Sequence, residues 1–225
     1  MPYDFAPEAI AHELKYHSLQ QVLFNLSPGD WKAGERGIAA LPGREIEFRD
    51  SVETALHYAT ALGCPRVHAM AGLAPEDVPP ETLRTVYLDN LHHAARRFAE
   101  YGIELLIEPI NTGDMPGYVL NHQAEGRAIL AELNEPNVKV QMDFYHAQIM
   151  DGDIWTTYQR HHADVGHIQI ASVPERHEPD TGEVNYPWIF AQLDAEGFDG
   201  WVGCEYKPRA GTQAGLGWLE AWKRQ

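Results

Sequence analysis

Four segments of the chain end in a side chain that can bind a metal ion through oxygen. Each segment is a short apolar run with one carboxylate or amide near its end. These side chains are Glu108, Asp143, Gln169 and Glu205. An all-oxygen set suits a hard divalent cation, Mg²⁺ or Mn²⁺, rather than zinc, which prefers histidine and cysteine. Three carboxylates brought together would also repel one another without a cation. The pattern therefore predicts one divalent-metal site.

The last of these segments, residues 200–208, shows why a ligand is expected. It reads Gly-Trp-Val-Gly-Cys-Glu-Tyr-Lys-Pro, and strand alternation places Glu205 and Lys207 on one face. Charged side chains at the end of an otherwise apolar strand are costly to bury unless something binds to them. We therefore interpret the end of this strand as part of a functional site.

The elements that carry these side chains alternate regularly along the chain. Apolar runs predict strands over 19–26, 67–71, 103–109, 138–143, 166–171 and 200–206. Helical spacing of apolar residues predicts helices over 6–16, 44–62, 80–101, 123–133, 154–162, 187–196 and 213–222. Apolar strands that alternate with helices indicate a parallel sheet covered by helices.

Two α/β architectures are consistent with this alternation of strands and helices. A doubly wound sheet is expected to carry a glycine-rich phosphate turn, and no G-x-G-x-x-G follows any predicted strand. A TIM-type (β/α) barrel places its functional residues at the C-terminal ends of several strands, which is the pattern of the four oxygen ligands. The sequence therefore predicts a TIM-type (β/α) barrel in a single domain over residues 1–225. This barrel is expected to be incomplete, with six of eight strands present.

The amino-acid composition limits the classes of partner that the protein is expected to bind. The 225 residues include 33 acidic and 17 basic side chains, for a formal net charge of −16. Nucleic acids and anionic membranes need a basic surface, so neither is expected as a partner. The sequence has no apolar run of membrane-spanning length and no charged-then-apolar segment, so we expect neither a membrane span nor a signal peptide. Its two isolated cysteines give no disulfide framework. We expect a cytoplasmic protein that acts on a small molecule.

Several motifs together resemble the hydroxypyruvate isomerase family. They are Ile107-Glu-Pro-Ile-Asn111, Gln141-Met-Asp-Phe-Tyr-His146, His167-Ile-Gln-Ile-Ala171, residues 177–186 and Gly203-Cys-Glu-Tyr-Lys-Pro208. That family belongs to the xylose-isomerase-like TIM barrels, alongside ketose 3-epimerases and endonuclease IV. The resemblance implies a metal-dependent ketose–aldose isomerase that interconverts hydroxypyruvate and 2-hydroxy-3-oxopropanoate (tartronate semialdehyde) through an enediol.

The resemblance also implies roles for individual residues. Glu108 and Glu205 would be the two catalytic bases, and both would also touch the metal. His146 is expected to hydrogen-bond a substrate oxygen, although it also reads as a lone loop histidine. Arg176 either holds a substrate carboxylate with two hydrogen bonds or is a solvated loop arginine. Lys207 either pairs with that carboxylate or balances the acidic site. The loop with Trp31, Glu35 and Arg36 reads equally as a lid or as a structural Ω-loop.

The chain departs from the family in two places. The family's first strand, first helix and most of its second strand would precede Met1, so the strands at 19–26 and 200–206 are expected to be free edges with a cleft between them. That cleft is expected to be bare or filled by a neighbouring chain. A homo-oligomer is therefore one of the two alternatives. Ser172 stands where relatives often have aspartate, which bears on substrate preference.

Other functions fit the same residues. A 2-oxo-tetronate isomerase or a ketose 3-epimerase would use the same site on a short sugar acid or sugar. An inactive barrel fragment would only bind metal or associate. A nuclease is disfavoured by the negative charge and by the lack of additional histidine ligands.

Overall fold

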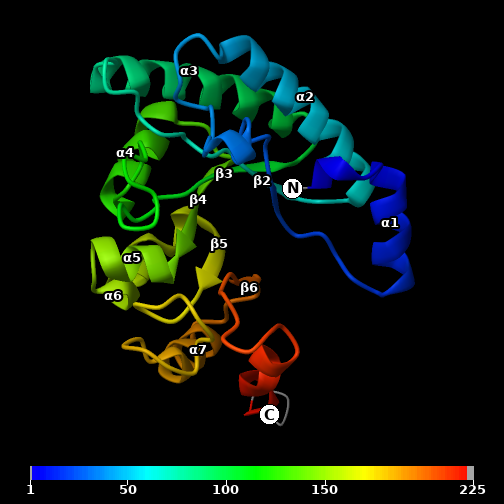
Figure 1. Ribbon diagram of the computed structural model, residues 1–225, viewed down its shortest axis with the longest axis vertical. Coiled ribbons are helices and arrows are strands. Elements are labelled where there is room, and N and C mark those ends of the chain that lie inside the picture. The colour runs from blue at the N-terminus through cyan, green and yellow to red at the C-terminus, as the bar shows by residue number, and fades with distance from the viewer. Residues whose placement is uncertain (1, 222–225) are drawn as a thin grey trace. The chain divides into compact units, whose positions relative to one another are not determined.

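The computed structural model describes residues 2–221. Contacts divide the chain into two compact units, Met1–Gln141 and Met142–Gln225, and each unit has helices and strands of its own (Figure 1). The boundary falls inside strand β4 (Val138–Asp143). The prediction of a single domain over residues 1–225 therefore stays a prediction.

Unit 1 is a layer of helices packed on parallel strands. Its helices are α1 (Pro7–Tyr16), α2 (Glu45–Leu62), α3 (Pro80–Ala99) and α4 (Gln123–Leu133), with 3-10 turns η1 (Pro2–Asp4) and η2 (Trp31–Ala33). Its strands are β1 (Phe24–Asn25), β2 (Arg66–His68), β3 (Glu104–Ile107) and the first part of β4. Helices α2 and α3 run side by side over these strands (Figure 1).

The core of unit 1 follows the apolar spacing of the sequence. In α2 the buried apolar side chains recur at helical intervals, and Gly63 ends the helix in a left-handed conformation with φ of 62°. Leu105, Leu106 and Ile107 of β3 are fully buried, as expected for a strand covered on both faces. Burial of such side chains contributes roughly 2 kcal/mol each to folding.

Unit 2 continues the alternation of strands and helices. Its helices are α5 (Phe144–Met150), α6 (Ile154–His161) and α7 (Tyr186–Ala195), with 3-10 segments η3 (His162–Asp164) and η4 (Ala214–Ala221). Its strands are the end of β4, β5 (Val165–Ile170) and β6 (Val202–Cys204). Strands β5 and β6 are parallel, and Gln169 lies opposite Gly203.

The six strands follow the order of the chain in the sheet. In unit 1 the pairs β1–β2, β2–β3 and β3–β4 are all parallel, with Asn25 opposite His68 and His68 opposite Leu106. The predicted parallel sheet and the number of six strands are confirmed for residues 2–221. Because parallel strands present their C-terminal ends at the same edge, this register sets where the candidate side chains emerge.

Several predicted elements differ from the structure in their bounds or in their type. The first predicted strand shrinks to two residues, because residues 19–23 pair with no strand in the described chain and Leu19 is exposed. Helix α5 replaces the loop expected after Asp143. Strand β6 ends at Cys204, before Glu205. The last helix is a 3-10 segment, and residue 222 of that prediction lies outside the described residues.

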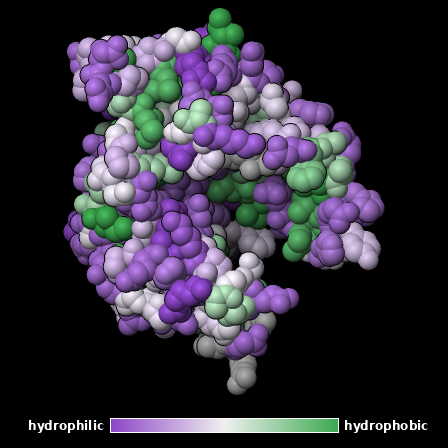
Figure 2. All heavy atoms as spheres, viewed as in Figure 1, coloured by the Kyte–Doolittle hydropathy of each residue, from purple (hydrophilic) through white to green (hydrophobic). Residues whose placement is uncertain are grey.

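The surface agrees with the acidic, polar composition. The face in Figure 2 is mostly hydrophilic, and its hydrophobic side chains form separate patches. Among the described residues, no helix combines the length and the apolar character that crossing a membrane requires.

The long loop of residues 27–37 is fixed by its own contacts. Asp30 accepts hydrogen bonds from the backbone N–H groups of Lys32 and Ala33, and Glu35 pairs with Arg44 at 2.6 Å. Gly37 forms an isolated bridge with Ala71. These contacts favour the structural Ω-loop over the lid for this segment.

The close approach at Gly37 gives a test of the fold. Its φ is 114°, and a Cβ atom there would overlap the backbone carbonyl of Met70. Gly37→Ala should therefore reduce the free energy of unfolding by about 3 kcal/mol, measured by urea denaturation. Gly43, with φ of 81° and open space around it, is the matched control; Gly43→Ala should cost about 1 kcal/mol. Equal losses at both sites would contradict the close approach as the cause.

Candidate active site

Asp143 is the most deeply buried carboxylate of unit 2. It is the last residue of β4 and the N-cap of α5, and its Oδ1 accepts the N–H of Tyr145 at 2.8 Å. The side chain is fully buried, and Oδ2 accepts no hydrogen bond from the described residues. Burial, together with the nearby charge of Glu205, raises the pKa of Asp143 to about 7, against the opposing effect of Arg176. This carboxylate is therefore poised to bind a cation or a proton.

Arg176 joins three of the predicted site residues. Its Nη2 lies 3.1 Å from Glu205 Oε2, 3.8 Å from Asp143 Oδ2 and 3.4 Å from His146 Nε2. The guanidinium also stacks 4.9 Å from the ring centre of Tyr145. The structure thus brings Asp143, His146, Arg176 and Glu205 into one cluster within unit 2.

The backbone of Arg176 is held in an unusual conformation. Its φ of 57° is left-handed, which is uncommon for a side chain without a local hydrogen-bonding group. Its N–H donates to Ser172 O at 2.8 Å, and its carbonyl accepts from the N–H of Lys207 at 2.7 Å. Such conformations persist where the surroundings impose them and are frequent at binding sites.

His146 lies in helix α5, so its prediction as a loop residue was wrong. It is 2 % exposed, and its Nε2 is 3.7 Å from Asp143 Oδ2. A helix position three residues after Asp143 gives the imidazole a fixed orientation that a loop would not. The cluster therefore contains one rigidly held imidazole beside the buried carboxylate.

Gln169 and Glu205 emerge from neighbouring strands. Gln169 shares a face of β5 with buried His167, and a Cβ atom on Gly203 would meet both side chains. The missing side chain at Gly203 therefore makes room for His167 and Gln169. Glu205 follows β6 directly, and its side chain is 54 % exposed, in contrast to buried Asp143.

Lys207 and Ser172 take mainly backbone and structural roles in the described residues. Lys207 is exposed, and its carbonyl lies 2.6 Å from His177 Nδ1. Ser172 is buried, and its Oγ accepts the N–H of His177 at 2.9 Å. Ser172 thus fixes the loop that carries Arg176, which is an indirect influence on the site.

Glu108 belongs to unit 1, where it follows strand β3. It is 5 % exposed, and its Oε2 lies 3.7 Å from Nδ1 of His68 at the end of β2. Burial lowers the pKa of His68 to about 3, so the imidazole is neutral. The charge of Glu108 adds to burial in raising the pKa of Tyr87, and it also contributes at Tyr118. His68, Tyr87 and Tyr118 thus place neutral polar groups near Glu108 within unit 1.

The side chains of unit 2 fit a divalent cation. Asp143 offers an oxygen that is buried and accepts no hydrogen bond from described residues, and Glu205 lies near enough to affect its ionisation. Oxygen donors of this kind match hard cations. The convergence of Glu108 with Asp143, Gln169 and Glu205 on one ion stays a prediction.

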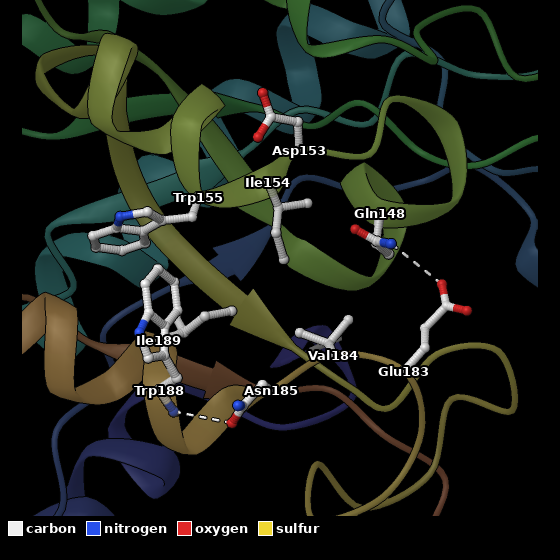
Figure 3. Close-up of a pocket in the computed structure, with 9 residues that line it drawn as sticks. All are labelled: Gln148, Asp153, Ile154, Trp155, Glu183, Val184, Asn185, Trp188 and Ile189. Atoms are coloured by element: carbon white, nitrogen blue, oxygen red, sulfur yellow. Dashed lines mark hydrogen bonds between the residues drawn. The ribbon is translucent and has the colours of Figure 1, made fainter.

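A separate pocket of about 260 Å³ lies in unit 2 between the starts of α6 and α7 (Figure 3). Trp155 and Trp188 form one side, and Gln148 and Glu183, joined by a hydrogen bond of 3.3 Å, form the other. None of the predicted site residues lines it. We therefore place the candidate active site elsewhere, at the cluster around Arg176.

The parallel sheet and the carboxylate cluster agree with the family comparison. The chain belongs to the xylose isomerase-like TIM barrel family, whose sequence profile matches residues 1–222. This finding confirms the predicted family and fold class.

Individual relatives carry the comparison further. The chain is 55 % identical to the 2-oxo-tetronate isomerase of Cupriavidus necator over 221 residues, which cover 98 % of this chain and 85 % of that protein. It is 42 % identical to the hydroxypyruvate isomerase of Escherichia coli over 222 residues, covering 99 % and 86 %. The crystal structure of an AP endonuclease, family 2, from Brucella melitensis is 52 % identical, with a TM-score of 0.95 and coverage of 99 % and 86 %. The named isomerases confirm the predicted class of enzyme.

Three residues of the described site were missed by the sequence analysis. His68, Tyr87 and Tyr145 all lie beside predicted site residues. His68 lay near the start of the strand predicted over 67–71, and only the structure places it at the end of β2, so its position in the sequence did not indicate a functional role. Tyr87 and Tyr145 carry no signal either, because an aromatic residue on a helix usually belongs to the core.

The charge of Arg176 should set the ionisation of Asp143. Arg176→Gln removes the positive charge that favours the carboxylate, so the pKa of Asp143 should rise above its present value by about one unit. Carboxyl ¹³C NMR titration of the metal-free protein measures this directly. Lys207→Gln is the matched control and should change that pKa little, because Lys207 is exposed and is not a cause of the shift. An unchanged pKa in Arg176→Gln would rule out the pairing.

Proposed function

We propose that this protein is a metal-dependent isomerase of short 2-oxo-3-hydroxy acids, with hydroxypyruvate as the leading substrate. The observation that carries the proposal is the position of Arg176 beside Asp143, His146 and Glu205. An arginine can bind a substrate carboxylate with two hydrogen bonds, while the carboxylates beside it suit a cation and proton transfer. The family and the isomerase relatives support the same chemistry.

A divalent cation, Mg²⁺ or Mn²⁺, would be held by Glu108, Asp143, Gln169 and Glu205. When bound, such a cation polarises a carbonyl group and stabilises negative charge on the adjacent oxygens. The buried Oδ2 of Asp143 supports its assignment as a ligand. Gln169 contributes a neutral oxygen, which limits the negative charge of the donor set.

The reaction moves a proton between adjacent carbons. One base takes a proton from C3 of hydroxypyruvate, which leaves an enediol after the oxygens exchange a proton, and a proton is then returned to C2. Glu108 and Glu205 are the proposed bases, because both are carboxylates at strand ends. The product is 2-hydroxy-3-oxopropanoate, so atoms and charge balance without a further reactant.

Arg176 is the proposed carboxylate-binding residue. Its guanidinium has five N–H donors in a planar fork, and its contacts with Glu205 and Asp143 involve one nitrogen. His146, fixed on α5, is proposed to hydrogen-bond a substrate oxygen. Lys207 is proposed to add positive charge near the substrate carboxylate.

The four-carbon homologue is a second candidate substrate. The identity of 55 % to a 2-oxo-tetronate isomerase favours it, and the chemistry at C2 and C3 is the same. A nuclease function is disfavoured by the net charge of −16, although the structurally similar Brucella protein is named as an endonuclease.

NMR assays of the purified protein with hydroxypyruvate and with 2-oxo-tetronate, each with Mg²⁺ or Mn²⁺, test the proposal. No product from either acid would contradict it.

Removing either proposed base should stop the reaction. Glu108→Gln and Glu205→Gln each preserve volume but remove the proton acceptor, so kcat should fall by at least about 10³-fold. Product formation followed by NMR, with circular dichroism as a check of folding, measures this. Glu183→Gln, in the separate pocket of unit 2, is the control and should keep normal activity. Near-normal turnover in either site variant would remove that glutamate from the mechanism.

The cation should be required and should bind more weakly in acid. Chelation should abolish activity, and added Mg²⁺ or Mn²⁺ should restore it. Because the pKa of Asp143 is raised to about 7, protons compete with the cation below that value, and affinity should fall up to about tenfold per pH unit. Calorimetric titration between pH 8 and 5.5 measures the affinity. A constant affinity across this range would show that Asp143 is not a ligand.

A further inference from the structure

His68 occupies a position in unit 1 that no role has so far explained. It is the last residue of β2, and β2 pairs with β3, which leads directly to Glu108. The imidazole is 1 % exposed, and its Nδ1 lies 3.7 Å from Glu108 Oε2. The carboxylate beside this imidazole therefore belongs to a proposed catalytic base.

Burying an imidazole at this position costs free energy that a purely structural role does not explain. Neither Nδ1 nor Nε2 has a hydrogen-bond partner among the described residues. Burying polar groups without hydrogen bonds costs on the order of 1–3 kcal/mol, and an aliphatic side chain would fill the space without that cost. Buried polar atoms left in this state are therefore candidates for function.

The described groups near Glu108 show what an N–H donor at His68 would add. Tyr87 is buried, and its hydroxyl has no hydrogen-bond partner among the described residues; Tyr118 accepts the N–H of Ala71 at 2.9 Å. An imidazole ring carries an N–H that can donate to a carboxylate. With Nδ1 3.7 Å from Oε2, this donor can orient the carboxylate of Glu108.

We propose that His68 is a positioning residue that orients the carboxylate of Glu108 through Nδ1–H. The present separation is about 0.8 Å longer than an ordinary N–H···O hydrogen bond of about 2.9 Å, so a small side-chain movement closes it. The catalytic part of this inference rests on the proposed function. The contact between His68 and Glu108 does not.

The kinetic test compares two substitutions. His68→Leu removes the donor and should lower kcat about ten- to hundredfold with KM changed less than about twofold, as for loss of an outer-shell partner. His68→Asn places an amide N–H near the position of Nδ1 and should recover most of the lost kcat. His93→Leu, a partly buried histidine of α3, is the control and should keep normal kcat. Normal kcat in His68→Leu, or equal losses in the leucine and asparagine variants, would overturn the proposal.

A second measurement is independent of activity. In a double-mutant cycle, the effect of His68→Leu on the folding equilibrium constant is measured in the wild-type protein and in Glu108→Gln. The two fold-changes should differ by a factor of at least about five. Equal fold-changes would overturn the contact itself. If the wild-type protein turns over neither acid but the coupling is present, the proposed function fails and the positioning contact stands. If Leu at this position prevents folding, the cycle is run with His68→Asn, and the same difference is required.

Discussion

The need to compensate a buried carboxylate governs unit 2. Asp143 is fully buried, and its charge is met by the backbone N–H groups of Tyr145 and His146, by the His146 ring and by Arg176. A buried charge without such partners would cost several kcal/mol. Arg176 reaches this position only because its loop is fixed by Ser172 and by the segment after β6. The left-handed backbone at Arg176, the N-cap of α5 and the end of β4 therefore serve one electrostatic requirement.

The sequence predicted the elements better than their ends. Strand β4 and helix α4 have the predicted bounds, because each is an apolar pattern with a clear stop signal. The pattern of residues 19–23 also predicted a strand. A strand forms only where a neighbouring strand supplies hydrogen bonds, and an apolar pattern does not show whether that neighbour is present. Helix α5 was missed because Phe144 and Tyr145 continue the apolar run of β4 without a turn residue between them. The side chain that starts this helix is Asp143 itself, which sequence reasoning had used only as a ligand.

The carboxylates of the candidate site could be predicted from the sequence, whereas its other residues were harder to predict. A carboxylate that follows an apolar strand is visible in the sequence, because polar residues are rare there. The contact of Arg176 with Asp143 joins residues more than thirty positions apart, and depends on a loop conformation that no local pattern encodes. His68 gave no such signal. It lay near the start of the strand predicted over 67–71, and only the structure ends that strand at His68. A single buried histidine is also more often a core residue than a functional one, so the pattern alone could not select it.

The two proposed bases lie in different environments, and this difference bears on how a proton is moved. Glu108 is 5 % exposed, among an imidazole and two phenols that keep their protons, so bulk water has little access to it. Glu205 is about half exposed and is held by Arg176. A proton carried by the buried group stays near the substrate, whereas a proton carried by the exposed group exchanges with solvent. An isomerase that must take a proton from one carbon and return one to the next can use both properties, because retention at one base and exchange at the other keep the two steps distinct. The neutral groups near Glu108 and the cationic partner of Glu205 are thus two ways to hold a proposed base in a fixed orientation after a strand.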